Sequence, residues 1–223
     1  MTPTPNHLGA EILGAETAAA LVAVLGRAQQ LGFIGKGAEL GFEVAHSVRF
    51  GKVAFEHFGR FAGTGGAGIG DVNCLDIGSG GGLPALAVAL GWEQTHWSLC
   101  EISTKRCDFL EWAVRRLKLD ARVNVVAGSV YELAKNSDYA GKYQVVTARA
   151  FAPISRVLGV SEDLLAQGGL LLVSDPPDGQ QTALAQEGAA QEDAAQKGET
   201  MPQLEACGSH EGISVFRKQP GGS

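Results

Sequence analysis

The chain has 223 residues, of which 45% are hydrophobic and 19% are charged, so a globally disordered protein is excluded and one large domain is expected. Its formal net charge of −6 argues against a protein that wraps nucleic acid by bulk electrostatic attraction. The first 25 residues contain no lysine or arginine, and the longest apolar run near the start is too short to span a bilayer. The sequence therefore predicts a cytoplasmic protein without a secretory signal or a membrane segment.

Residues 1–70 are expected to form a helical N-terminal extension. Within 17–31, the residues Leu21, Val22, Leu25 and Ala28 have the spacing of one helix face, and a second helix is predicted over 39–58. Glycines between 32 and 37 indicate a turn, and the glycine-rich stretch 63–70 has the composition of a linker. The predicted boundary therefore falls at residue 70, with the second domain over 71–223.

After residue 71 the pattern alternates between short apolar strands and helices. The predicted strands cover 72–77, 96–100, 122–126, 144–147 and 170–173. The predicted helices cover 84–90, 103–119 and 153–165, the last one ended by Gly168 and Gly169, and two further strands are expected over 203–207 and 212–217. Residues 178–200 are expected to be a solvated helix or a loop. Such alternation predicts a doubly wound α/β fold, with helices on both faces of a mainly parallel sheet.

The cysteines give no sign of a metal centre. Cys74, Cys100, Cys107 and Cys207 form no Cys-x-x-Cys pair, and no His-x-x-His spacing stands nearby. Cys74 and Cys100 fall in apolar strand-like segments, where a buried thiol is the usual state. The sequence therefore predicts no metal site.

A glycine-rich turn follows the first predicted strand, in the segment CLDIGSGGGLP over 74–84. Glycines at such a turn let a ligand lie against the backbone at the carboxyl end of the sheet. A dinucleotide fingerprint needs a third glycine where this chain has Leu83, so that motif fails. The spacing of Gly78, Gly80 and Gly82 after Asp76 instead resembles the S-adenosylmethionine (SAM) motif of class I methyltransferases. The alternative is a glycine-rich turn that holds no ligand.

Glu101 follows the second predicted strand, a little over twenty residues beyond the glycine turn. A carboxylate at this point can accept hydrogen bonds from the two hydroxyls of a ribose. Because SAM and NAD both contain that ribose, Glu101 supports nucleoside binding without choosing between them. The alternative is an acid that caps the helix starting near Ser103, and the two roles are compatible.

Several segments together resemble one family, the bacterial small-subunit rRNA guanine-N7 methyltransferases (GidB/RsmG). They are the glycine motif, EISTKRCDFL over 101–110 and TARAFA over 147–152, with weaker similarity at 32–35 and at His46 and Ser47. The resemblance covers about residues 20–175. It implies a Rossmann-like class I methyltransferase sheet with a helical N-terminal extension, SAM as the methyl donor and a guanine N7 of 16S rRNA, or of the small ribosomal subunit, as acceptor.

The resemblance also implies a set of site residues. Cofactor binding would involve Asp76, Gly78, Gly80, Gly82, Leu83, Glu101, Ser129, Val130, Tyr131 and Arg149. Ser129 to Tyr131 would lie beside the adenine, and Glu101 would hold the ribose. Arg149 and His46 are the candidate catalytic residues, at the mouth and wall of the site. Their alternatives are a salt bridge on the rim of the sheet for Arg149 and a partly buried helix histidine for His46.

The chain departs from the family pattern at three places. Arg49 stands where the family has an Asp, Ala45 where it has an Arg, and Ser174 to Pro177 where it has a Lys-Gly pair. Because lost basic residues weaken phosphate contacts, a small-molecule methyltransferase and a SAM-binding protein with reduced activity stay open as alternatives. A cluster of cations near one helix could form a local phosphate-facing patch, although such a cluster is more often an ordinary solvated helix face. It consists of Lys105, Arg106, Arg115, Arg116, Lys118 and Arg122.

Overall fold

The structure is a computed structural model, and it describes residues 5–61, 71–175, 182–186 and 204–219. The predicted linker over 63–70 and most of the segment 178–200 lie outside these residues. Among the described helices, none is long and apolar enough to cross a lipid bilayer.

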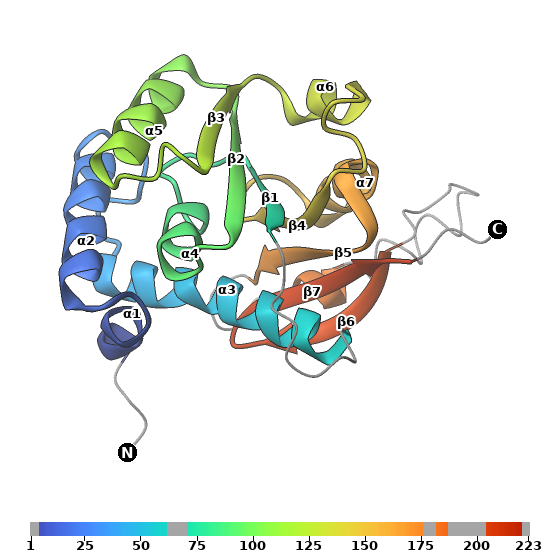
Figure 1. Cartoon of the computed structure of the whole chain (residues 1–223), viewed down its shortest axis with the longest axis horizontal. Coiled ribbons are helices and arrows are strands. Elements are labelled where there is room, and N and C mark those ends of the chain that lie inside the picture. Colours follow the sequence, from blue (N-terminus) through green and yellow to red (C-terminus); the bar gives the residue numbers. More distant parts are fainter. Residues whose placement is uncertain (1–4, 62–70, 176–181, 187–203, 220–223) are drawn as a thin grey trace.

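The described strands form one seven-stranded sheet in the order β3-β2-β1-β4-β5-β7-β6 (Figure 1). Strands β1 to β5 are parallel, whereas β7 runs antiparallel to both β5 and β6. The bounds are β1 (Val72–Ile77), β2 (Thr95–Glu101), β3 (Val123–Ala127), β4 (Tyr143–Ala148), β5 (Leu165–Ser174), β6 (Leu204–His210) and β7 (Ile213–Lys218). The predicted α/β class is confirmed, and so is the final pair of strands.

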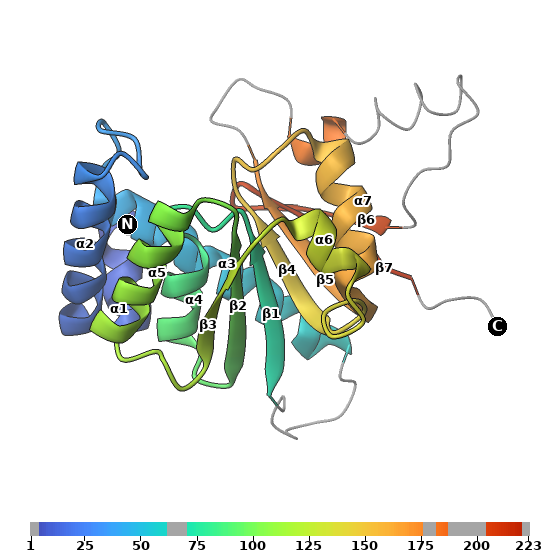
Figure 2. The ribbon, with the colours of Figure 1, turned by 90° about the horizontal axis from the view of Figure 1, so that it is seen from above.

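Helices cover both faces of the sheet (Figure 2). They are α1 (Pro5–Leu13), α2 (Ala15–Gln30), α3 (Leu40–Phe61), α4 (Ala85–Gly91), α5 (Thr104–Arg116), α6 (Val130–Lys135) and α7 (Ile154–Leu164). Residues of α2 to α5 form one hydrophobic cluster with the sheet, and residues of α6 and α7 form a second cluster on the other side. Neighbouring residues of β1 divide between the clusters, because Cys74 faces the first and Leu75 the second.

The N-terminal helices share the core of the sheet. Leu25 of α2 and Val48 of α3 are fully buried and belong to the same cluster as Leu86, Trp97 and Leu170. Since α3 packs on the sheet and on α4, while α1 and α2 pack on the helices of that face, the three bury apolar surface that would otherwise meet water. The predicted division at residue 70 stays a prediction.

Two local predictions differ from the structure. Gly168 and Gly169 do not end a helix, because α7 ends at Leu164 and β5 begins at the next residue, so both glycines lie inside the strand. The β4–β5 register shifts between Tyr143 and Val145, and a Cβ on Gly169 would come within 3.0 Å of the Tyr143 carbonyl oxygen. The glycines therefore allow the backbone of β5 to form a bulge beside β4. Helix α6 was not predicted, because six residues are too few for a periodic pattern.

Candidate active site

The glycine turn joins β1 to α4 in a conformation that only glycine adopts easily. Gly78, Gly80 and Gly82 have positive φ angles of 71°, 52° and 91°. The amides of Gly78 and Ser79 donate to the carbonyl oxygen of Cys100, at 2.9 and 3.1 Å, and so tie the turn to the end of β2. A Cβ at Gly80 would meet nothing closer than 3.7 Å, so its backbone stays open to a ligand.

Glu101 faces this turn from the end of β2 and is only 3% exposed. One carboxylate oxygen accepts the amide hydrogen of Gly80 at 2.9 Å, and the other accepts that of Ser103 at 2.9 Å, just before α5. Glu101 therefore does accept a backbone hydrogen bond at the start of α5, as the capping alternative predicted. Each carboxylate oxygen has a further lone pair, with which it can also accept a hydrogen bond from a ribose hydroxyl.

Asp76 lies one residue before the end of β1 and is completely buried. Thr147 Oγ1 donates to its Oδ1 at 2.6 Å, while its Oδ2 has no hydrogen-bond partner among the described residues. Burial raises the pKa of this carboxyl from 3.8 to about 7, although the Thr147 hydrogen bond and the nearby Arg149 act in the opposite direction. An unpartnered buried oxygen beside the turn is suited to a cationic ligand group.

The segment after β3 approaches the turn from the neighbouring strand. The Gly128 amide donates to the Glu101 carbonyl oxygen at 2.9 Å, and Ser129 stands directly before α6. The Val130 side chain is buried in the second hydrophobic cluster, so only its backbone can meet a ligand, whereas Tyr131 is 42% exposed. The Leu83 side chain likewise packs against the first cluster.

Ile102 is a candidate that the sequence prediction missed. It follows Glu101 directly, and its side chain is 75% exposed. An apolar side chain beside a strand-end carboxylate can cover the face of a flat ring, which would remove it from water. The available signal was this isolated isoleucine between a strand and a helix, in a place where polar residues are usual.

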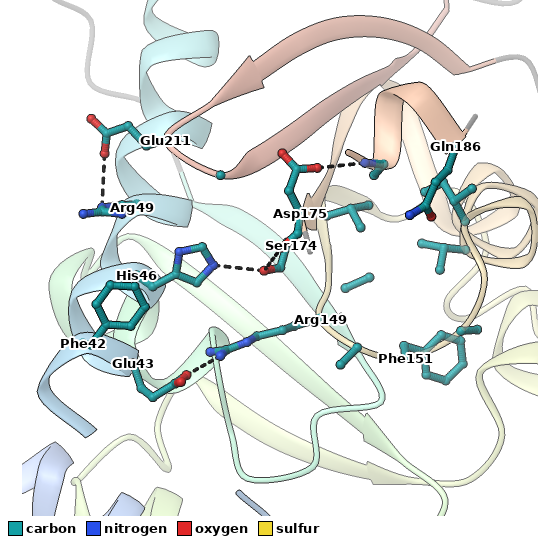
Figure 3. Close-up of a pocket in the computed structure, with 18 residues that line it drawn as sticks. Phe42, Glu43, His46, Arg49, Arg149, Phe151, Ser174, Asp175, Gln186 and Glu211 are labelled. Atoms are coloured by element: carbon teal, nitrogen blue, oxygen red, sulfur yellow. Dashed lines mark hydrogen bonds and ion pairs between the residues drawn. The ribbon is translucent and has the colours of Figure 1, made fainter. Parts of the chain in front are cut away.

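A cavity of about 810 Å³ opens beside the turn, between α3 and the carboxyl ends of β4 and β5. Figure 3 shows its wall from α3, the segment after β4, the end of β5 and the turn between β6 and β7. Both predicted catalytic residues, Arg149 and His46, line it. Phe151 separates the cavity from the glycine turn. Its side chain lines the cavity and also packs against Gly78, where an added Cβ would come within 2.4 Å of the ring.

The two arginines of the cavity wall are both paired with carboxylates. Arg149 binds Glu43 of α3, and Arg49 Nε lies 3.3 Å from an oxygen of Glu211 in the β6–β7 turn (Figure 3). Glu211 also accepts from Lys52 at 3.1 Å. The family's Asp position is therefore filled by an arginine whose charge is balanced by an acid from the far end of the chain.

His46 is neutral at physiological pH. Burial, followed by the charges of Arg149 and Arg49, lowers its pKa from 6.5 to about 4. Its Nε2 lies 3.0 Å from Ser174 Oγ, at the end of β5. A neutral imidazole can donate or accept a hydrogen bond to a bound substrate, but it offers no positive charge to a phosphate.

Asp175 ties the end of β5 to the C-terminal strands. Its carboxylate accepts hydrogen bonds from Ser214 Oγ at 2.5 Å, Ser209 Oγ at 2.6 Å and the Ala183 amide at 2.9 Å. The family's Lys-Gly pair is thus replaced here by an acid that fixes the cavity wall.

Solved structures with the same architecture place the fold in a known class. The cofactor-bound protein Rv0187 from MTB matches with a TM-score of 0.60 and 16% identity, over 97% of this chain and 98% of that protein. An O-methyltransferase from Bacillus cereus, in complex with SAH, matches with a TM-score of 0.57 and 14% identity, over 90% and 91%. The fold is that of the class I SAM-dependent methyltransferases, as predicted.

The family follows from the sequence comparison. The family model described as GidB, rRNA small subunit methyltransferase G, matches residues 67–205, so the chain belongs to this family. The Ribosomal RNA small subunit methyltransferase G of Burkholderia thailandensis is 39% identical over 98 residues, covering 43% of this chain and 41% of the relative. The same-named protein of Brachyspira hyodysenteriae is 34% identical over 101 residues, covering 45% and 46%. The matches thus span less than half of these curated relatives.

Proposed function

We propose that this protein transfers the methyl group of SAM to N7 of a guanine in 16S rRNA, with the small ribosomal subunit as its partner in the cytoplasm. The observation that carries the proposal is the bond between Glu101 and the Gly80 amide, with a cavity of nucleotide size on the other side of Phe151. Membership of the GidB family supports the choice of acceptor.

The residues around the glycine turn fit SAM. Glu101 would take the ribose, Asp76 the positive end of the methionine part, and Ile102 and Tyr131 the adenine. The unpartnered Asp76 Oδ2, the open space at Gly80 and the exposed Ile102 support this assignment. When bound, SAM supplies an electrophilic methyl group on a positively charged sulfur.

The cavity residues would position the acceptor. Guanine N7 carries an unprotonated lone pair, so the chain needs no general base, and a neutral His46 agrees with that requirement. Arg149 would orient the base edge through its N–H donors, and Phe42 and Phe151 of the cavity wall offer apolar surface to a flat ring. Catalysis would then depend on orientation and on a fixed electrostatic environment.

The test is methyl transfer to bacterial small ribosomal subunits that lack N7 methylation. We expect incorporation of label from radioactive SAM and a guanine-specific signal in primer extension across 16S rRNA, while calorimetry shows binding of SAM and SAH but not of NAD. Binding of SAM without label in any RNA would contradict the proposed acceptor. Absence of SAM binding would contradict the assignment of the turn as well.

A small-molecule methyltransferase is the second candidate. The favouring observation is that both arginines of the cavity are already neutralised by carboxylates, which weakens attraction for an RNA phosphate. The same radioactive SAM, incubated with small heteroaromatic acceptors and then with ribosomal subunits, separates the two candidates by the product that carries label. A protein that binds SAM and labels neither acceptor would match the reduced-activity alternative.

A further inference from the structure

The Arg149 guanidinium would need a bonding partner outside its own loop to hold an acceptor in a defined orientation. It follows β4 directly, in a segment of bends where Ala150 has a φ angle of 50°, and its long side chain is 27% exposed. An arginine on such a segment has many rotamers, and a freely rotating guanidinium would position an acceptor poorly.

Glu43 provides that support from a helix. It lies in the first turn of α3, is 14% exposed and binds the Arg149 guanidinium (Figure 3). Its neighbours Val44 and Ala45 are buried, and Glu39 accepts the amide hydrogens of Gly41 and Phe42 at the start of the helix. The carboxylate is therefore mounted on a fixed element, and its charge is favoured by the helix N-terminus.

The other ionic groups near Arg149 do not take over this task. Asp76 acts on Arg149 electrostatically but is buried within the central strand β1, where it accepts its hydrogen bond from Thr147. Asp175 is engaged by two serine hydroxyls and a backbone amide, and Glu211 is paired with Arg49 and Lys52. Only one of the five N–H donors of Arg149 is used by the Glu43 bond, so the others can face the cavity.

We infer that Glu43 is a positioning residue for the acceptor: it holds the Arg149 guanidinium against α3, so that the remaining donors point into the cavity. The inference rests on the proposed function. It also assigns a role to α3, which supplies this carboxylate to the cavity wall beside Phe42 and His46. The competing explanation is that the pair only attaches α3 to the sheet.

A double-mutant cycle distinguishes the two explanations. We expect Glu43→Gln to lower kcat for rRNA methylation by roughly tenfold to a hundredfold, with the Kd for SAM changed less than about twofold. In an Arg149→Ala background the same change should have almost no effect, and Glu43→Asp should restore part of the activity. Glu56→Gln, an exposed change on the same helix, is the matched control and should keep wild-type activity. Additive losses, or a Glu43→Gln enzyme within about twofold of wild type, would overturn the inference.

A second measurement needs no acceptor, so it also separates this inference from the proposed function. The Arg149 Nε–H group, observed by NMR, should be ordered in the wild-type protein and become mobile in Glu43→Gln, but not in Glu56→Gln. Unchanged order in Glu43→Gln overturns the inference even if the enzyme methylates rRNA. An ordered Arg149 in a wild-type protein that labels no RNA would instead count against the proposed acceptor.

Discussion

The buried carboxyl of Asp76 makes stability depend on pH in a definite direction. Its pKa is raised to about 7 in the folded chain, against 3.8 as the ordinary value. Between these values the folded state binds more protons than the unfolded state, so the free energy of unfolding should fall as pH rises from about 4 to about 7. The slope from this group is at most about 1.4 kcal/mol per pH unit.

Asp76→Asn should remove this dependence. We expect the stability difference between wild type and Asp76→Asn to shift in favour of the variant as pH rises through that interval, measured by urea unfolding at pH 5, 6 and 7. Asp120→Asn, at an exposed position, should follow the wild-type profile. Parallel curves for wild type and Asp76→Asn would mean that this carboxyl is ionised throughout the range.

Single residues differ in how far the sequence alone could place them. The meeting of Glu101 with the glycine turn was predictable, because adjacent parallel strands bring their carboxyl ends to one edge. Glu43 was not predictable, because its partner lies 106 residues away and their approach depends on how α3 packs on the sheet. The neutrality of His46 also required the structure, because it results from burial and from two arginines.

At the scale of elements, Arg122 does not belong to the cluster of cations around α5 that was a candidate for a basic patch. Its guanidinium turns inward and donates to the carbonyl oxygens of Ala89 at the end of α4, of Thr95 at 3.3 Å and of Trp92 at 3.5 Å. It therefore caps the Ala89 carbonyl in the last turn of α4 and joins the end of this helix to the start of β2. Arg115 is paired with Glu111, so the positive field of this face is weaker than the count of cations indicates.

Removing the Arg122 guanidinium should destabilise the fold. We expect Arg122→Met to lower the free energy of unfolding by about 1–3 kcal/mol, because part-buried carbonyls lose a charged donor. Arg116→Met, on the exposed face of α5, should change it by less than about 0.5 kcal/mol. Chemical denaturation measures both, and equal effects of the two variants would show that the contacts of Arg122 contribute nothing specific.

The pattern of elements was largely predictable, because apolar runs separated by turns and helices describe a parallel sheet directly. The first strand was predicted with its observed bounds, and the other predicted strands within a few residues at most ends. The wrong or missing predictions concern a glycine pair and a helix of only six residues. Gly168 and Gly169 signal a bulge and a helix end equally well in sequence, and β5 extends across them.

For the whole molecule, the N-terminal helices are expected to be necessary for folding. A chain starting at Asp71 would lose the cover over Leu86, Trp97 and Leu170, which are buried in one cluster with α2 and α3. We expect this fragment to lack a cooperative thermal transition and to bind a hydrophobic dye, and co-expression with residues 1–70 to restore the transition. A cooperative fragment with wild-type affinity for SAM would support two independent domains.

The walls of the cavity come from α3, from the segment after β4 and from the β6–β7 turn, whereas the glycine turn and Glu101 lie close together in the first half of the chain. During synthesis on the ribosome, a nascent chain would complete its donor-binding segment long before Glu211 and Gly212 emerge. We therefore expect a stalled or prematurely ended product to lack the wall that Glu211 and Gly212 supply, and with it the ionic partner of Arg49.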